Sequence, residues 1–323
     1  MEFFNSLEKN ISLVHPAYFI IRGFVDIPNI KYYFVFLFFI YIVSVIGNTL
    51  VMIIIILDHT LRSPKYMVVF NLALTDLLSS SALVPKVIDI FLFNHPYIPF
   101  NECIVFMFFC FTLLSMQALN LVALSYDRLM AIIYPLHYQV KVTHKRMLTL
   151  IICFWLYTMS ITFTSSGLLT RVSFCKSVVI NSYFCDHGPL YQLGCNDITP
   201  NRAIGGLAPV LILWLPLAFI LISYCCIAYA LIKISTVHER LKAIKTCTGH
   251  LSLVAIYFLP TMIVYIFGSK TQPNVRIINL SLAAVVPPML NPIIYVFQTQ
   301  EIQQSFKKLL KIKGQSKILI NKS

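Results

Sequence analysis

Charged residues are scarce in this chain. They make up 11% of its 323 residues, whereas soluble domains carry about 25%. Hydrophobic residues account for 58%, and the mean hydropathy is +0.80. A chain of this composition lacks the charge to cover a water-soluble globule. The composition therefore excludes a soluble domain and indicates an integral membrane protein.

Several other patterns are missing. Residues 1–30 lack the apolar core of about 7–15 residues that a secretory signal peptide needs, so we expect the first span to act as its own signal anchor. The chain shows no repeat of about 20–50 residues, which argues against a solenoid. Neither Gly-x-Ser-x-Gly nor His-Glu-x-x-His stands on any apolar run. The sequence therefore predicts no enzyme, no catalytic residue, no cofactor and no metal site.

Long runs with little or no charge are present instead. Each reaches the roughly 20 residues that a helix needs to cross a hydrocarbon core of about 30 Å. Shorter connectors separate the runs, and most carry proline, charge or both. The seven runs are residues 32–57, 66–93, 103–126, 147–170, 203–232, 246–269 and 277–300.

These runs predict an all-α membrane protein, a seven-transmembrane helix bundle that forms one domain from residue 32 to residue 300. Residues 1–31 are expected to form an extracellular N-terminus. Residues 301–323 are expected to form a short amphipathic helix and a cytoplasmic tail. The helix is expected along the inner membrane surface, because Ile302, Phe306, Leu309 and Leu310 fall on one face of a Lys-rich segment.

The distribution of Lys and Arg predicts the orientation. The N-terminus and the second, fourth and sixth connectors together carry a net charge of +2, whereas the opposite side carries +12. Lys and Arg accumulate in cytoplasmic loops, so the N-terminus is expected outside the cell and the C-terminus in the cytoplasm. The excess of Lys and Arg is explained by their accumulation on the cytoplasmic side of a membrane protein. The positive net charge therefore gives no reason to expect nucleic acid as a partner.

Four of the nine cysteines lie at or beyond the predicted outer face, where disulfides persist. They are Cys103, Cys175, Cys185 and Cys195, and four cysteines permit three pairings. The last three lie ten residues apart in the connector 171–202, which is expected to form a stapled lid over the mouth of the bundle. Asn10 begins an Asn-Ile-Ser sequon on the same side and is a candidate glycosylation site.

Asp76 lies about ten residues inside the second run, where a lone carboxylate in lipid costs several kcal/mol. It is expected to be protonated, bound to a cation, or hydrogen-bonded to groups such as Asn48 and Asn291. Asp76 is therefore a candidate ion site. A coupling-ion site in a small-solute transporter is one alternative that this position leaves open, although no inverted repeat or pair of broken helices is visible.

Asp127 and Arg128 end the third run, and Pro135 is expected to stop its helix. A charge pair where an apolar helix meets water can be a simple interfacial anchor or part of a functional site. In the sixth run, Pro260 removes a backbone hydrogen bond and gives that helix a possible hinge.

One set of residues occurs in a fixed order along the seven runs. Their order and positions resemble the pattern of rhodopsin-like (class A) G-protein-coupled receptors. The set is Asn48, residues 72–76, Asp127, Arg128, Trp155, Pro216, Tyr224, Pro260 and residues 291–295. A second set is similar to the olfactory (odorant) receptor family. It comprises residues 61–66 (LRSPKY), 126–128 (YDR), 134–138 (YPLHY), 184–186 (FCD), 242–247 (KAIKTC) and 288–295 (PMLNPIIY).

The resemblance implies an odorant receptor of the plasma membrane, which binds a small molecule within the bundle and activates a heterotrimeric G protein, in this family a stimulatory one that raises cAMP. It implies disulfides between Cys103 and Cys185 and between Cys175 and Cys195. It also implies an activation switch and G-protein contact formed by Asp127, Arg128, Tyr224, Asn291, Pro292 and Tyr295. The chain departs from the family at Leu129, which replaces the usual Tyr, and at Gln117, where an acid is common.

The same resemblance indicates the ligand. Cys110 stands where receptors for biogenic amines carry Asp, and Val285 stands where opsins carry their retinal-binding Lys. Neither an amine nor retinal is therefore expected, and the pocket should be mostly apolar. Its expected residues are Cys110, Phe111, Leu114, Ser115, Ile212, Phe258, Met262, Tyr265, Ser281 and Val285. A non-olfactory small-molecule receptor of the same superfamily is the nearest alternative, and a transporter is a more distant one.

Overall fold

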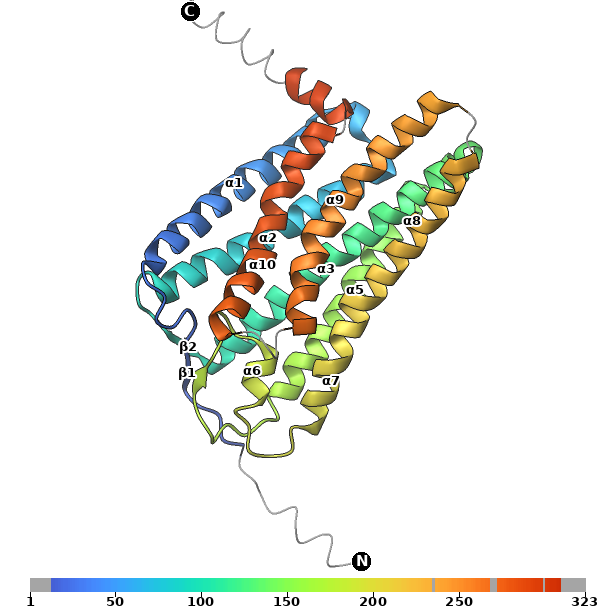
Figure 1. Ribbon diagram of the computed structural model, residues 1–323. Coiled ribbons are helices and arrows are strands. Elements are labelled where there is room, and N and C mark those ends of the chain that lie inside the picture. The colour runs from blue at the N-terminus through green and yellow to red at the C-terminus, as the bar shows by residue number, and fades with distance from the viewer. Residues whose placement is uncertain (1–12, 234–235, 268–271, 299, 309–323) are drawn as a thin grey trace, which may run out of the picture.

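A computed structural model describes residues 13–233, 236–267, 272–298 and 300–308 of the chain. Seven helical segments among these residues are long and apolar enough to cross a membrane (Figure 1). This confirms the predicted seven-helix bundle. The spans are α1 (Ile30–Leu57), α2 (Pro64–Phe91), α3 (Phe100–Ile133), α5 (His144–Leu169), a fifth span in three parts, α9 (Val237–Phe267) and α10 (Pro273–Gln298).

The fifth span runs without interruption through α7 (Thr199–Pro209), a π-helical turn η3 (Val210–Trp214) and α8 (Leu215–Lys233). Shorter pieces lie in the connectors: η1 (His59–Leu61), η2 (Pro135–His137), α4 (Tyr138–Lys141) and α6 (His187–Tyr191). The third helix continues beyond the uncharged run, so Asp127 and Arg128 lie on it, in agreement with the expected stop at Pro135. It ends at Ile133, two residues before Pro135, which cannot continue a helix.

Local sequence explains where two other helices begin. Pro64 occupies the first turn of α2, where its missing N–H costs no hydrogen bond. Before α5, the hydroxyl of Thr143 accepts the backbone N–H of Arg146 at 3.3 Å, so Thr143 caps that helix. Both signals are readable without tertiary information.

A small sheet, which the sequence does not predict, covers one end of the bundle. Its strand order is β2 (Tyr97–Pro99), β1 (Tyr18–Ile21), β3 (Val179–Ile180), so the N-terminal strand is the central one. β1 pairs antiparallel with β2 and parallel with β3. Phe19 and Ile21 are buried while Tyr18 is exposed. All four residues of β1 are apolar (Tyr-Phe-Ile-Ile), so the sequence shows no apolar–polar alternation that would indicate a half-buried strand.

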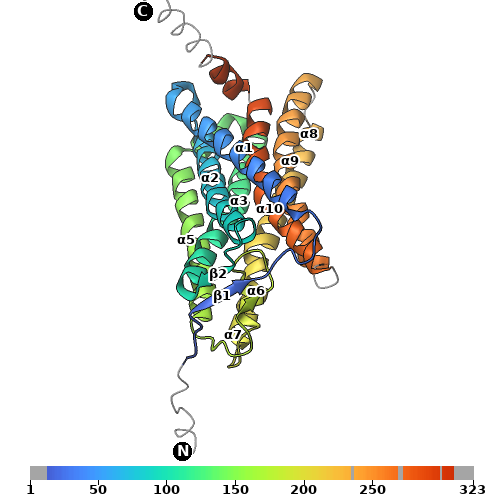
Figure 2. The same cartoon turned by 90° about the vertical axis from the view of Figure 1, so that its left-hand side faces the viewer.

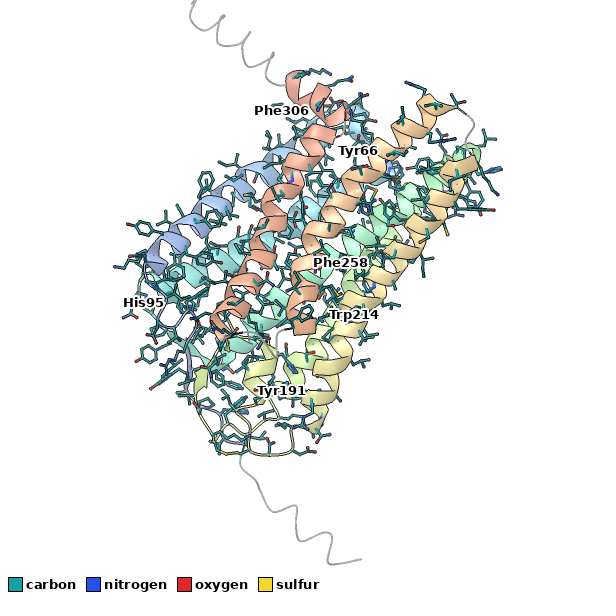
Figure 3. The ribbon with its side chains drawn as sticks, in the orientation of Figure 1. Tyr66, His95, Tyr191, Trp214, Phe258 and Phe306 are labelled. Carbon is teal, nitrogen blue, oxygen red and sulfur yellow. A yellow bond between two sulfur atoms is a disulfide. The ribbon has the colours of Figure 1, made fainter. Side chains whose placement is uncertain are left out.

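The two ends of the bundle differ, and we name them by their contents. The sheet end contains β1–β3, α6 and both disulfides, and the described chain begins there (Figures 1 and 2). The tail end contains η2, α4 and the helical residues 300–308. Tyr191 lies at the sheet end, Phe258 lies between the two ends, and Phe306 lies at the tail end (Figure 3).

Helix α3 is the most buried of the seven spans and packs against α2, α5, α8 and α9. Helices α1 and α10 also pack together, at a close approach where Gly47 faces Pro292. A Cβ atom on Gly47 would lie 2.7 Å from Cγ of Pro292, so a larger residue would force the two helices apart. The bundle is thus organised around α3.

After α10, residues 300–308 form a short helix at the tail end. Ile302 is fully buried there against the bundle, and Lys65 of α2 lies 3.4 Å from Glu301. These contacts attach the beginning of the predicted amphipathic helix to the bundle. Leu309, Leu310 and the candidate glycosylation site Asn10 lie outside the described residues.

Candidate ligand cavity and polar switch

A cavity of about 470 Å³ lies in the sheet-end half of the bundle. Its walls come from α3, α5, α7, η3, α9 and α10, and residues of α6 close it from the sheet end. Pockets for small molecules usually measure about 300–1,000 Å³ and are lined mainly by apolar groups. The cavity therefore has the size and lining of a small-molecule site.

Half of the residues expected in a pocket line this cavity, and half do not. The five that line it are Phe111, Leu114, Ser115, Ile212 and Tyr265. The five that lie elsewhere are Cys110, Phe258, Met262, Ser281 and Val285. All five of these side chains are buried. They pack between helices, although their positions in the family pattern predicted that they would line a pocket.

The five residues that do not line the cavity pack against other helices. Cys110 and Val285 pack in a cluster between α1, α2 and α10, and Phe258 and Met262 pack in the main core. Ser281 Oγ lies 2.5 Å from the hydroxyl of Tyr33 of α1.

The cavity also has residues that the sequence does not indicate. The connector after α5 contributes Asp186, His187 and Tyr191, and α5 itself contributes Ser165 and Ser166. One signal was available for Asp186. It follows Cys185, which is bonded to Cys103 near the start of α3, so it must lie close to the mouth of the bundle. Nothing in the apolar run marks Ser165 or Ser166.

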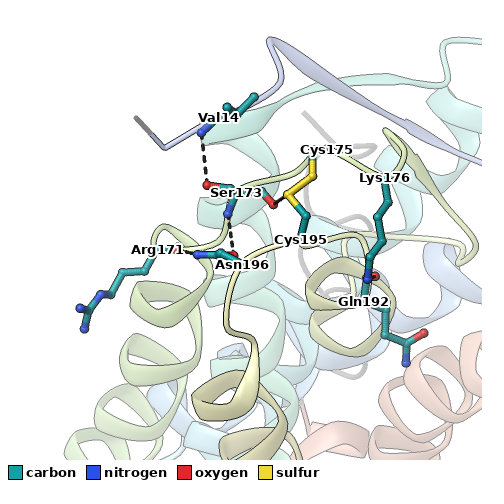
Figure 4. The surroundings of a disulfide bond; sticks show 8 residues. All are labelled: Val14, Arg171, Ser173, Cys175, Lys176, Gln192, Cys195 and Asn196. Carbon is teal, nitrogen blue, oxygen red and sulfur yellow. Dashed lines mark hydrogen bonds between the residues drawn. A yellow bond between two sulfur atoms is a disulfide. The ribbon is translucent and has the colours of Figure 1, made fainter. Parts of the chain in front are cut away.

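Two disulfides hold the connector over the cavity. Cys103 is bonded to Cys185, and Cys175 is bonded to Cys195. Around the second pair, hydrogen bonds fold the connector on itself, as in Figure 4. Asn196 accepts the N–H of Ser173 at 3.0 Å and donates to the carbonyl of Arg171 at 2.7 Å. The result is a lid with fixed shape, as the sequence predicts.

Charges are few at the cavity and are paired. Arg276 Nη2 of α10 lies 3.9 Å from Asp186 Oδ2 of the lid. Burial raises the pKa of Asp186, and the charge of Arg276 opposes this rise. Burial lowers the pKa of His187 to about 4, and the side chain of Asn201 offsets only part of this effect. His187 is therefore neutral at physiological pH.

Asp76 lies in the middle of the bundle and is completely buried. Gln117 Nε2 of α3 donates to its Oδ1 at 2.9 Å, and Asn291 Nδ2 of α10 donates to its Oδ2 at 2.6 Å. The expected partner Asn48 instead donates to the carbonyl of Pro288 at 2.8 Å. Both carboxylate oxygens of Asp76 thus accept an amide proton, which ties α2 to α3 and α10.

Asp127, at the tail end of α3, is buried and bonded to the next connector. Tyr138 of α4 donates its hydroxyl to Asp127 Oδ1 at 2.6 Å, and Arg128 Nε lies 3.8 Å from Oδ2. Burial and the negative charge of Asp127 raise the pKa of Tyr138, which therefore stays a donor. Asp127 and Arg128 are brought together with Tyr138, which was expected only as part of the motif 134–138 and without an individual role.

A second link at the tail end joins three helices through His250 of α9. Its Nε2 lies 3.1 Å from the carbonyl of Leu121 of α3, and its Nδ1 lies 2.7 Å from the hydroxyl of Tyr224 of α8. A carbonyl only accepts, so Nε2 carries the proton and Nδ1 accepts from Tyr224. Tyr224 was expected in the switch, and the structure adds His250 as its hydrogen-bond partner.

Comparison with known proteins decides the family. A family profile described as olfactory receptor matches residues 37–313. The chain belongs to the olfactory receptor family. It is 34% identical to human olfactory receptor 51I1 over 83% of this chain and 86% of that protein. It is 32% identical to mouse olfactory receptor 1E16 over 94% of this chain and 96% of that protein. The same values hold for rat olfactory receptor 1.

Membership of this family makes the chain a multi-pass membrane receptor and not an enzyme. In the receptor, a further contact connects the cavity to the middle of the bundle. Tyr257 of α9 lines the cavity and donates its hydroxyl to the carbonyl of Leu114 of α3 at 2.8 Å. Pro260 follows within the same helix. Helices α3 and α9 therefore border the cavity at one end and meet through His250 at the other.

Proposed function

We propose that the receptor binds a small odorant in the sheet-end cavity and activates a heterotrimeric G protein from the tail end. The sheet end faces the outside of the plasma membrane, and the tail end faces the cytoplasm. Coupling is to a stimulatory G protein, so the response is a rise in cAMP. The observation that carries the proposal is that α3 and α9 border the cavity and are also joined at the tail end by separable hydrogen bonds.

The charges support the orientation. The side that includes the tail end carries a net charge of +12 against +2 on the other side, and cytoplasmic loops are the ones rich in Lys and Arg. Both disulfides lie at the sheet end, and disulfides persist in oxidising surroundings. A lid with two disulfides is therefore stable outside the cell.

The proposed signal is a shift between two arrangements of α9. A ligand acts only if it binds one arrangement more tightly than the other. In the described structure, His250 holds the tail-end part of α9 to α3 and α8. A ligand that contacts Tyr257 and Tyr265 favours an arrangement in which α9 pivots at Pro260 and these bonds open.

The opened tail end supplies the G-protein contact. Asp127 is held by Tyr138 in the closed arrangement, with Arg128 beside it. When α9 moves, Arg128 turns from Asp127 toward the G protein, and Tyr224 is freed from His250. Asn291, Pro292 and Tyr295 belong to the same half of α10, which Asp76 ties to α2.

The test is Arg128→Ala in cells that report cAMP. We expect loss of the odorant-evoked rise, because this side chain carries the contact with the G protein, while the receptor still reaches the cell surface. Lys145→Ala, which removes an exposed positive charge at the start of α5, is the matched control. Normal cAMP signalling by Arg128→Ala would contradict the proposal, and solute uptake without any cAMP response would favour a transporter.

A further inference from the structure

The hydroxyl groups on the cavity wall are mostly occupied within their own helices. Ser115 donates to the carbonyl of Phe111 at 2.6 Å, Ser165 to that of Ile161 at 3.0 Å, and Thr261 to that of Tyr257 at 3.0 Å. A hydroxyl has one proton but two lone pairs. Toward the cavity these groups therefore offer lone pairs only, and they can accept a hydrogen bond but not donate one.

Two buried polar atoms on the wall differ from the rest. Ser166 Oγ of α5 and His187 Nε2 of α6 have no hydrogen-bond partner among the described residues, although the two residues are only 7% and 9% exposed. The side chain of Asn201 interacts with the ring of His187 and partly offsets the lowering of its pKa, but neither His187 Nε2 nor Asn201 Oδ1 makes a hydrogen bond of normal geometry among the described residues. A buried polar atom without a partner destabilises the protein. Two such atoms on one cavity wall indicate that their partner is a bound molecule.

The charges near these atoms limit what that molecule can be. Asp186 and Arg276 are the charged residues on the cavity wall among those described, and they lie 3.9 Å apart as a pair. Burial keeps His187 neutral, since its pKa is lowered to about 4. An ion that enters such a site loses its hydration and finds no free opposite charge. An uncharged ligand is therefore favoured over a carboxylate or an ammonium.

Building on the ligand role proposed above, we infer that Ser166 and His187 form a subsite for the hydroxyl group of an uncharged, mainly apolar alcohol. The hydroxyl donates to one of the two atoms and accepts from the other, so that one ligand group satisfies both. Its own proton can also be accepted by the neighbouring wall hydroxyls. A ketone can accept from both atoms but has no proton to donate to the neighbouring wall hydroxyls, and a hydrocarbon leaves both protein atoms without partners. The apolar part of the ligand lies against Phe111, Leu114 and Ile212.

The test compares octan-1-ol, octan-2-one, octane, octanoic acid and octylamine on cells that express the receptor and a cAMP reporter. These compounds share a chain length and differ in their polar group. We expect octan-1-ol to be the most potent, on the order of tenfold above the ketone, which is the effect of one good buried hydrogen bond. Octane, the acid and the amine are expected to give no response at concentrations where the alcohol saturates.

Variants then assign the effect to the two side chains. Ser166→Ala and His187→Phe should each lower the potency of octan-1-ol on the order of tenfold and reduce its advantage over the ketone. His187→Gln, which keeps a donor and an acceptor, should restore part of it. Ser160→Ala is the matched control, since Ser160 lies on the same helix, is exposed and donates to Tyr157. Surface labelling of each variant separates lost binding from lost folding.

The outcomes distinguish this inference from the proposed function. If the acid or the amine is the best agonist, or if Ser166→Ala matches Ser160→Ala at normal surface level, the alcohol subsite is wrong and odorant reception stands. If none of these compounds nor any member of a broad odorant panel raises cAMP in cells with surface receptor, both the subsite and the proposed function fail.

Discussion

The two ends of the bundle are held together by different kinds of bond. At the sheet end, two disulfides, a three-stranded sheet and the pair of Asp186 and Arg276 fix the lid over a cavity. At the tail end, the described residues include no disulfide, and hydrogen bonds of Tyr138 and His250 join the helices.

The difference follows from what each end has to do. An empty volume in a protein loses packing contacts and collapses unless its walls are fixed. Covalent links and a sheet supply that rigidity without filling the cavity. A switch must instead open under the binding energy of a small ligand, and single hydrogen bonds of about 0.5–1.5 kcal/mol are weak enough to be broken. Rigidity therefore belongs to the sheet end and reversibility to the tail end.

The strongest test of the rigid end is removal of its disulfides. Cys103→Ser should abolish surface expression, and Cys175→Ser should lower it less. The first bridge spans 82 residues and the second spans 20, and the chain-entropy model gives the longer loop a stabilisation greater by about 1 kcal/mol. Surface labelling by flow cytometry measures both. Cys153→Ser, at an exposed free cysteine, should express normally; equal loss in all three variants would contradict the comparison.

The reversible end is tested most directly by His250→Phe. The change keeps a ring of similar shape but removes the bonds to Leu121 and Tyr224, which together contribute about 1–3 kcal/mol to the closed arrangement. We therefore expect a several-fold rise in cAMP without ligand. His238→Phe makes the same change at an exposed position of α9 and should leave that level low. Unchanged basal signalling in His250→Phe would show that this link does not hold the closed state.

Tyr138→Phe should act in the same direction but more weakly. It removes one hydroxyl bonded to Asp127, worth about 1 kcal/mol, while Arg128 remains beside the carboxylate. The expected result is a small rise in basal cAMP and a modest gain in odorant potency. Tyr134→Phe, at a half-exposed position just before η2, serves as the control. A fall in basal cAMP in Tyr138→Phe would reverse the role we give to this bond.

The smallest effect is expected in the middle of the bundle. Asp76 is a candidate ion site by position, but both of its oxygens already accept amide protons from Gln117 and Asn291. We expect replacement of sodium by N-methylglucamine in the assay to leave odorant potency unchanged within error. Gln117→Glu removes one donor and adds a negative charge, so this variant should gain a dependence on sodium. A marked sodium effect on the unaltered receptor would indicate a cation at Asp76.

Features that depend on contacts between segments distant in the sequence could not be predicted from the chain, whereas local features could. The seven spans follow from seven apolar runs, because each run must satisfy its own backbone in lipid as a helix. The end of α3 follows from Pro135, whose ring no helix accommodates. Strand β1 depends on partners about 80 and 160 residues away, and nothing in four residues specifies them. The same is true of Tyr138 beside Asp127.

The cavity shows the same division in detail. Cys110 and Phe111 are consecutive residues of α3, and the family resemblance predicted that both would line the pocket. The structure buries Cys110 in the cluster with α1, α2 and α10, whereas Phe111 packs against the edge of that cluster and also lines the cavity. Which face of a helix meets a neighbour depends on how the helices rotate and pack, and an apolar run with no polar face carries no record of that rotation.

The sequence by itself determined the class of the protein, the number of spans and the charge asymmetry of the two sides. These are properties of composition and local order, which the bilayer converts directly into helices. Tertiary structure alone decided that β1 joins the lid, that His250 links three helices, and that Ser166 and His187 line the same cavity. Each of these depends on distant segments being brought together, and hydrogen bonds are formed only between groups that packing has placed within reach.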